Sequence, residues 1–385
     1  MNGLDKTNGN GRRRLGRVER LVVKVGSAVI AGGGRPSPRV IADLAYEVSV
    51  LQHRGVQVVM VVSGAVAAGY EALGLPSPPG GVVERQAAAS IGQPRLMALF
   101  ARAFARHRVG VAQLLMTAED IENRRRFLSA RHTLQRLLTG GVVPIINEND
   151  ALSDDESKVG DNDHLAALVS NLVSAQALIL LSTAEGVGAD GGRGPVISTV
   201  EPADPVERHV GPARSETGVG GMAAKVSAAR LASSGGVWTL IAGGREPQVL
   251  VRLIAGEPLG TLFVPAESRL TARKRWIALR TRSRGVIRVD AGARQAIREG
   301  GASLLPSGVV GVQGEFAMGA RVELQDADGC TFAVGLASYP SDAIRRLQGR
   351  RRDEFKAVLG YEYVREIISR DDMVILNGAG SERLA

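Results

Sequence analysis

The sequence predicts an α/β fold with a mainly parallel sheet sandwiched between helices, followed by a small β-rich C-terminal domain. Short runs of β-branched residues alternate with segments of helical periodicity as far as about residue 243. Such alternation is typical of parallel sheets covered on both faces. Beyond about residue 267, short strand patterns divided by glycines indicate a second domain.

The expected strands of the first region are short, apolar and rich in valine and isoleucine. The first, RLVVKV, stops at Gly26, and the second, VQVVMVV, runs into a Ser-Gly turn at Ser63. The strands are expected at residues 20–25, 56–62, 109–115, 141–146, 177–182 and 236–243.

The expected helices carry apolar residues at helical spacing between recognisable start and stop signals. Ser37 and Pro38 are typical of a helix start, and Gly55 of its end. Thr117 with Asp120 opens a later helix. The helices are expected over residues 37–55, 82–107 and 118–138, from about residue 162, and from near residue 222.

Polar residues follow several of these strands. Ligands of parallel α/β sheets bind beyond the carboxyl ends of the strands. We therefore expect a site where these ends meet, formed by residues 24–27, 63–65, 147–150 and 182–183.

The C-terminal region reads as a small domain of short strands and one helix. Strand patterns occur in GVIRVD, GVVGVQGEF, ARVELQDADG and TFAVGLASY, and SDAIRRLQG is helical. The expected organisation is a basic tail at 1–17, an α/β domain at 18–266, a linker at 267–282, the β-rich domain at 283–376 and a C-terminal tail at 377–385.

Composition excludes several classes of protein. No apolar run approaches the roughly 18 residues of a membrane helix, and the N-terminus lacks the apolar segment of a secretory signal. A single cysteine, Cys330, excludes an internal disulfide, fits a reducing cytoplasm, and is expected to be buried. The five histidines have no metal-ligand spacing, so no metal site within the protein is predicted.

The net charge of +9 comes from the two ends of the chain, because residues 18–266 hold 23 basic and 23 acidic residues. Only six of the 48 basic residues are lysines. A composition so biased to arginine suggests that lysine stands where a compact ammonium is needed.

Two of these lysines, Lys24 and Lys225, lie in glycine-containing turns that suit an anion. Lys24 ends the first strand beside Gly26, and Lys225 follows the segment GVGGMAA at the start of a helix. A helix start offers free backbone N–H groups to a phosphate, and an ammonium strengthens the site. Isolated lysines and glycine-rich turns are often only solvated, yet two such lysines among so few favour phosphate binding.

Residues 147–163 gather seven acids around one lysine, Lys158. Acids suit positive groups, such as a substrate ammonium or the magnesium of a nucleotide. Asp150 can pair with an amine while Asn147 and Asn162 donate to a carboxylate, which selects an amino acid. Asp161 and Asp163 can bind metal or hold the lysines in place. The alternative is a solvated loop with Asp161 capping a helix; it suits Asp154, Asp155 and Glu156 better than NEND and GDND.

The motifs VVKVGSAVI, VVSGAVAAG, INEND, KVGDND and GVGGMAAK occur in the order found in the glutamate 5-kinases of the amino acid kinase fold, and the chain resembles that family from about residue 19. LGYEY and RDDMV resemble the end of the PUA domain attached to longer bacterial members. The resemblance implies ATP-dependent phosphorylation of the L-glutamate γ-carboxylate to L-glutamyl 5-phosphate, the first step of proline biosynthesis.

The resemblance also implies roles for individual residues. Lys24 and Lys225 correspond to the pair that neutralises the transferring phosphoryl group, and Asp163 to the aspartate that positions them. The glutamate-binding positions are Ser63, Asn147, Asp150 and Asn162. The nucleotide-binding positions are Lys24, Ser182, Thr183, Val219, Gly220, Gly221, Met222, Ala223, Ala224 and Lys225. Lys158 matches a position near the glutamate pocket without an assigned step.

Several positions depart from the family pattern near the nucleotide. Ser182-Thr183 replaces the usual Thr-Asp, which removes a carboxylate, and Ala223-Ala224 replaces hydroxyl residues. Gly188 replaces a common tyrosine, and Ser27-Ala28 replaces Thr-Ser. These differences bear on contacts with ATP, while the phosphate cations and the glutamate-binding residues are present.

The expected cofactors are ATP and Mg²⁺, and the expected partners are L-glutamate, proline as a feedback inhibitor, and further copies of the chain in a dimer or tetramer. Two alternatives stay open. One is a kinase of another small amino or carboxylic acid. The other is an RNA-binding or regulatory protein acting through the PUA-like domain, where residues 267–385 carry a charge of +5.

Overall fold

A computed structural model of the chain describes residues 11–32, 34–117, 120–121, 124–151, 162–210, 221–265, 283–351, 354–360 and 366–376. These residues fall into two compact units. The larger unit comes from residues up to 121 and from 133–269, and the smaller from 122–132 and from 270 onwards. The predicted linker, 267–282, and the predicted C-terminal tail, 377–385, lie outside the described residues.

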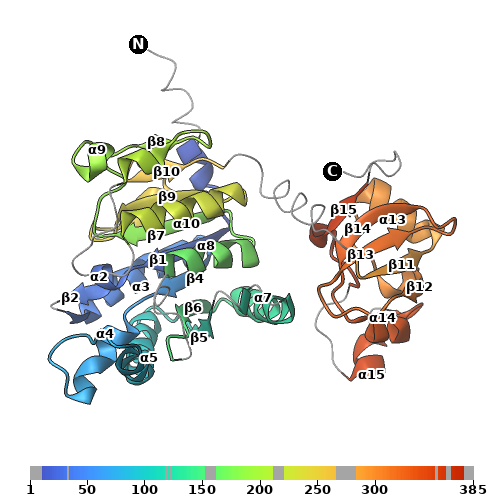
Figure 1. The fold of residues 1–385 in the computed structure, drawn as a ribbon, viewed down its shortest axis with the longest axis horizontal. Helices are drawn as coiled ribbons and strands as arrows, with labels where there is room; N and C mark the ends of the chain where they lie inside the picture. The colour runs from blue at the N-terminus through green and yellow to red at the C-terminus, as the bar shows by residue number, and fades with distance from the viewer. Residues whose placement is uncertain are drawn as a thin grey trace, which may run out of the picture. The chain divides into compact units, whose positions relative to one another are not determined.

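The larger unit is built on an eight-stranded sheet with the order β5-β6-β4-β1-β7-β9-β10-β8 (Figure 1). Its first six strands in this order are parallel, whereas β10 runs antiparallel to β9. The strands span Val111–Met116 (β5), Val143–Glu148 (β6), Gln57–Val62 (β4), Arg20–Val25 (β1), Ala177–Ser182 (β7), Trp238–Gly243 (β9), Thr261–Phe263 (β10) and Thr199–Val200 (β8). The predicted mainly parallel sheet is confirmed.

Two groups of helices cover the sheet (Figure 1). Helices α8 and α10 pack against each other, and α3 contacts α5 and α11. The helices span Ser27–Ile30 (α2), Pro38–His53 (α3), Ala65–Gly69 (α4), Val82–Ala105 (α5), Arg124–Thr139 (α7), Asn162–Leu172 (α8), Ala189–Gly192 (α9), Met222–Ser234 (α10) and Val249–Ile254 (α11). Ser37 caps α3 by accepting a hydrogen bond from the backbone of Val40, as its sequence pattern predicts.

The alternation of side chains along β1 decides which face of the sheet carries the site. Leu21, Val23 and Val25 are fully buried and join the core cluster that includes the apolar residues of α3. Successive strand residues point to opposite faces. Lys24 therefore points to the other face, where α8 contacts β1.

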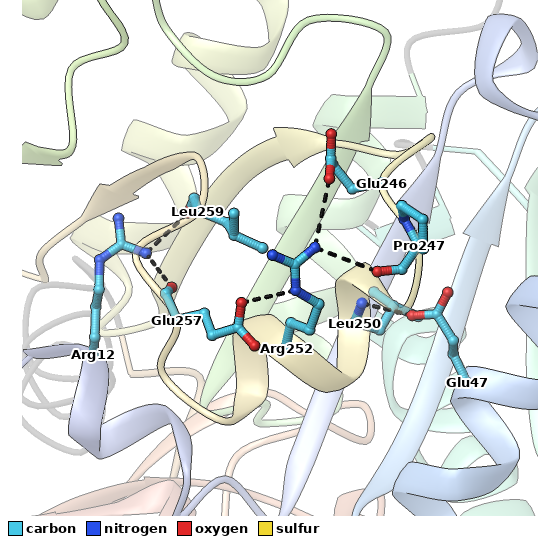
Figure 2. A network of polar contacts seen from close by, with 8 residues as sticks. All are labelled: Arg12, Glu47, Glu246, Pro247, Leu250, Arg252, Glu257 and Leu259. Carbon is cyan, nitrogen blue, oxygen red and sulfur yellow. Dashed lines mark hydrogen bonds and ion pairs between the residues drawn. The ribbon is translucent and has the colours of Figure 1, made fainter.

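The N-terminal segment is anchored to the same unit by a buried arginine. Residues 11–15 form a helical turn in which Arg12 is 5% exposed and Leu15 is fully buried. Arg12 Nη1 donates to the carbonyls of Glu257 and Leu259 at 2.9 and 2.8 Å (Figure 2). Its Nη2 donates to the carbonyls of Ser198 and Gly260 at 2.9 and 3.1 Å. Part of the segment predicted as a basic tail is thus packed into the fold.

A buried carboxylate joins α3 to the start of α11. Glu47 Oε2 accepts a hydrogen bond of 2.7 Å from the backbone N–H of Leu250 (Figure 2). Burial raises the pKa of Glu47 to about 7, although the backbone hydrogen bonds of Leu250 and Val251 act in the opposite direction. Below about pH 7 the side chain is therefore mainly a neutral acid.

The smaller unit contains a five-stranded sheet with the order β12-β11-β13-β14-β15. Its pairs are antiparallel except for β11 with β13. The strands span Gly285–Val289 (β11), Val309–Gln313 (β12), Arg321–Gln325 (β13), Thr331–Leu336 (β14) and Met373–Ile375 (β15), and the helices Ala291–Gly300 (α13), Ser341–Leu347 (α14) and Phe355–Leu359 (α15). The β-rich second domain is confirmed, and α13, α15 and β15 are additions to the predicted elements.

One expectation about this unit is wrong. Cys330 is exposed rather than buried, because it lies between β13 and β14, where its backbone N–H donates to Asp326 at 2.9 Å.

Among the described residues, no helix combines the length and the apolar character needed to cross a membrane.

Candidate active site

The start of α8 lies at the centre of the candidate site. Its first residue, Asn162, and its second, Asp163, are 2% and 1% exposed. Helix α8 contacts β1, β4, β6 and β7, the four central strands whose ends were expected to meet. Asn162 and Asp163, which are adjacent in the first turn of α8, therefore both contribute to the site.

Asp163 brings together two lysines from distant parts of the chain. Lys24 Nζ lies 2.7 Å from Asp163 Oδ1, and Lys225 Nζ lies 2.9 Å from Asp163 Oδ2. Lys24 comes from β1, and Lys225 from the first turn of α10. All three side chains are at least nine-tenths buried. We refer to Lys24, Asp163 and Lys225 as the lysine triad.

The ionisation of Asp163 follows from these contacts. Burial by itself raises the pKa of this carboxyl, but the charges of Lys24 and then Lys225, with their hydrogen bonds, outweigh burial. The pKa of Asp163 is therefore held below its ordinary value. Two ammonium groups against one carboxylate leave the lysine triad with a net positive charge, which attracts an anion.

The turn before Lys225 suits that anion. Gly221 is the N-cap of α10, and it leaves the N–H groups of the first turn without a side-chain cap. Such N–H groups and the helix dipole favour negative charge. Met222, Ala223 and Ala224 follow in that first turn, whereas Val219 and Gly220 lie outside the described residues.

A second network of neutral amides begins at Asn162. Asn162 Nδ2 donates to Ser63 Oγ at 3.0 Å and to Asn147 Oδ1 at 3.2 Å. Asn147 Nδ2 donates in turn to Gln93 Oε1 at 2.8 Å. We call Ser63, Asn162, Asn147 and Gln93 the amide chain. Three of the four were predicted site residues, and Gln93 was missed because nothing in the local pattern of α5 distinguishes it.

Asp150 follows β6 by two residues and is partly buried. Burial raises the pKa of Asp150 to about 6, and the positive charge of Arg85 on α5 acts in the opposite direction. A buried carboxylate with a raised pKa gains from a cation brought by a ligand, because the cation offsets the cost of burial.

Ser182, which was predicted to bind the nucleotide together with Thr183, is the last residue of β7, next to β1 in the sheet, and Thr183 follows the strand. Ser182 is buried and accepts a hydrogen bond of 3.3 Å from the backbone N–H of Ala184, while Thr183 is exposed. Lys158 and Asp161 lie outside the described residues.

Within the part of the chain that the structure describes, no group of three or more His, Cys, Asp or Glu side chains is arranged to hold a metal ion. Both carboxylate oxygens of Asp163 face lysines. The lysine triad fits a magnesium ion that arrives on nucleotide phosphates, because Mg²⁺ usually keeps several waters and binds substrate phosphates with few protein ligands.

Comparison with known proteins finds relatives over most of the chain. Residues 19–242 match the model of the Amino acid kinase family, and residues 285–359 match the PUA domain. A glutamate 5-kinase of Citrifermentans bemidjiense is 44% identical over 368 residues, which cover 94% of this chain and 99% of the relative. Those of Anaeromyxobacter dehalogenans and Myxococcus xanthus are 46% and 45% identical, over 95% of this chain and 98% of each relative.

Proposed function

This chain belongs to the amino acid kinase family, and from that premise we propose that it transfers the terminal phosphoryl group of ATP to the γ-carboxylate of L-glutamate. The products are ADP and L-glutamyl 5-phosphate, which opens proline biosynthesis. The observation that carries the proposal is one carboxylate, Asp163, held between the ammonium groups of Lys24 and Lys225. Similarity to glutamate 5-kinases over nearly the full length supports the choice of acceptor.

The lysine triad suits phosphoryl transfer because this reaction needs alignment and charge neutralisation more than a protein nucleophile. Lys24 and Lys225 bind the oxygens of the transferring group, and Asp163 positions the two lysines. An oxygen of the substrate carboxylate attacks phosphorus while the bond to the oxygen of the leaving ADP breaks. A carboxylate has no proton to lose at neutral pH, so the acceptor needs no general base.

The amide chain and Asp150 suit the two ends of an amino acid. The carboxylate of Asp150 accepts hydrogen bonds from the substrate ammonium. Ser63, Asn147 and Asn162 supply the polar groups that orient the substrate carboxylates. A dicarboxylic acid without an amine gives the partly buried Asp150 no ligand cation to pair with, and this cost selects against it.

The nucleotide binds between the end of β7 and the start of α10. Its phosphates meet the N–H groups after Gly221, with Lys225 beside them. The proposed nucleotide-binding residues are Lys24, Ser182, Thr183, Val219, Gly220, Gly221, Met222, Ala223, Ala224 and Lys225. Magnesium carried by the nucleotide neutralises part of the phosphate charge when it is bound.

Regulation and assembly extend this proposal. Proline, like glutamate, carries an α-carboxylate and a positively charged α-nitrogen, and we expect it to compete at the pocket formed with Asp150. We also expect the chain to form a dimer or tetramer. We expect it to act in the cytoplasm, because its single cysteine forms no internal disulfide.

An ADP-release assay with Mg-ATP tests the proposal when L-glutamate, L-aspartate and N-acetyl-L-glutamate are supplied separately. We expect turnover with L-glutamate, and trapping of the product by hydroxylamine identifies an acyl phosphate. The other two acids differ in chain length or lack the ammonium, so we expect at least tenfold lower kcat/KM, which corresponds to about 1.4 kcal/mol. Absence of turnover with L-glutamate would refute the assignment.

A further inference from the structure

The amide chain ends on a buried glutamine whose role follows from the direction of its hydrogen bonds. Gln93 lies on α5, is 7% exposed, and accepts a hydrogen bond from Asn147, which is 54 residues away in the chain. Because this argument concerns the amino acid pocket, it rests on the proposed function.

One backbone N–H group fixes the direction of every bond in the amide chain. The N–H of Glu148 can only donate, and it donates to Asn147 Oδ1 at 2.9 Å and to Asn162 Oδ1 at 3.2 Å. Because this N–H group is always a donor, it identifies which side-chain atom of Asn147 and of Asn162 is the oxygen. Asn147 must then present its NH₂ group to Gln93, and only the side-chain oxygen of Gln93 can accept it.

The same logic determines what the two ends of the amide chain offer. At one end, Ser63 Oγ accepts from Asn162, so its own O–H remains a donor. At the other end, Gln93 Nε2 is buried and is without a hydrogen-bond partner among the described residues. An unsatisfied buried donor costs stability, and an apolar residue of similar size avoids that cost. The acceptor that Gln93 supplies to Asn147 therefore serves the orientation of the amide chain more than the stability of the fold.

The backbone holds Gln93 in place through a close crossing of α4 and α5. An added Cβ on Gly92 would lie 1.8 Å from the carbonyl oxygen of Ala65, and one on Gly69 would lie 1.9 Å from that of Ala88. No side chain fits at either position, so the two helices touch through their backbones. Gly92 directly precedes Gln93, and α4 begins two residues after Ser63. The crossing thus fixes both ends of the amide chain relative to each other.

We infer that Gln93 is a positioning residue of the amino acid pocket, which locks Asn147, and through it Asn162 and Ser63, in the orientation that receives the acceptor substrate. Gln93 acts through Asn147, and among the described residues it makes no hydrogen bond to the lysine triad. Its loss affects the amino acid side of the reaction selectively.

The test compares three substitutions on α5 and measures the KM values for L-glutamate and ATP, kcat and the thermal midpoint. Gln93→Met keeps the length of the side chain but removes the acceptor, and we expect about a tenfold higher KM for L-glutamate with the KM for ATP within twofold. Gln93→Glu keeps an accepting oxygen and should restore the KM for L-glutamate to within about threefold of the parent. Phe100→Leu is the matched control, because Phe100 is fully buried on the same helix outside the amide chain; it should lower the midpoint without changing either KM.

A double-mutant cycle shows whether Gln93 acts through Asn147. In an Asn147→Ala background, Gln93→Met should add less than about a twofold further change in the KM for L-glutamate. Independent, multiplying effects overturn the inference, as does an unchanged KM for L-glutamate in Gln93→Met. If that variant does not fold, Gln93→Glu decides, since a tenfold rise there contradicts the role of the acceptor. Failure of the parent protein to use L-glutamate at all refutes the proposed function instead.

Discussion

Two consecutive residues, Asn162 and Asp163, belong to networks of opposite character. Asp163 joins two buried ammonium groups through charge. Asn162 joins a chain of neutral groups in which each hydrogen bond has a fixed direction. Charge attracts an anion over several ångströms, whereas amides recognise a ligand by orientation. In the proposed reaction the first network binds the phosphoryl group and the second binds the amino acid, and one helical turn of α8 contributes to both.

The largest expected effect comes from removing a charge from the lysine triad. Lys225→Ala should lower kcat by about 10³-fold, because a group that stabilises transition-state charge is typically worth two to three orders of magnitude or more. Lys24 still pairs with Asp163 in this variant, so the thermal midpoint should change little. Steady-state kinetics with circular dichroism checks both expectations. If the variant is destabilised but its folded fraction has the same kcat as the parent, Lys225 does not have this catalytic role.

A negative charge placed in the amide chain should weaken the binding of the amino acid rather than that of the nucleotide. Asn162→Asp keeps the shape of the side chain but replaces its NH₂ group with an oxygen, so it can no longer donate to Ser63 or Asn147. The added negative charge also repels the carboxylates of the substrate. We expect the KM for L-glutamate to rise by about 10²-fold and the KM for ATP to change far less. Parallel increases in both values would mean that the two networks do not act separately.

The titration of Asp150, which has a raised pKa of about 6, should affect the KM for L-glutamate but not the KM for ATP. Asp150 is ionised above this pKa and protonated below it, and only the carboxylate pairs with a substrate ammonium. At pH 5 about one molecule in eleven is ionised, so the KM for L-glutamate should rise about tenfold from its value at pH 7.5. Asp150→Asn should have a high KM at both pH values. The KM for ATP serves as the internal control, and a flat profile in the parent protein counts against this role.

The smallest expected effect lies outside both networks, at Glu47. Its folded pKa of about 7 is above the ordinary value of 4.5, so the folded state binds the proton more tightly and is stabilised as pH falls from about 7 towards 4.5. Relative to the parent, Glu47→Gln keeps an acceptor for Leu250 and removes this dependence. We expect the thermal midpoint of the parent to gain a few degrees more than that of the variant between pH 7.5 and 5.5. Kinetic constants at pH 7.5 should be the same for both proteins.

Much of the site was predictable because its signals are local. Lys24 and Lys225 stand out as rare lysines beside glycines at a strand end and a helix start. Ser63, Asn147 and Ser182 lie within one residue of a strand end, and the carboxyl ends of parallel strands share one edge of a sheet. The boundaries of β1, β4, β7 and β9 also follow from apolar runs that stop at glycine or serine.

The missed features depend on contacts between distant residues. Gln93 sits in ordinary helical sequence and Arg12 in a run of arginines predicted as a tail, and only their packing against other elements shows that each is buried. Cys330 was expected inside the fold, yet its place between two strands leaves it exposed. A residue type gives the average tendency for burial, while the backbone around it decides the actual exposure.

Periodicity and turn chemistry are local properties of the chain, so the alternation of strands and helices, the two-domain order and most of the polar residues at the strand ends follow from the order of the amino acids. That Lys24 and Lys225 share one carboxylate, and that Gln93 completes the amide chain, follows from the packing of distant elements. Both depend on where helices cross strands and each other, and the close approach of α4 and α5 at Gly69 and Gly92 is set by backbone contact that no local pattern encodes.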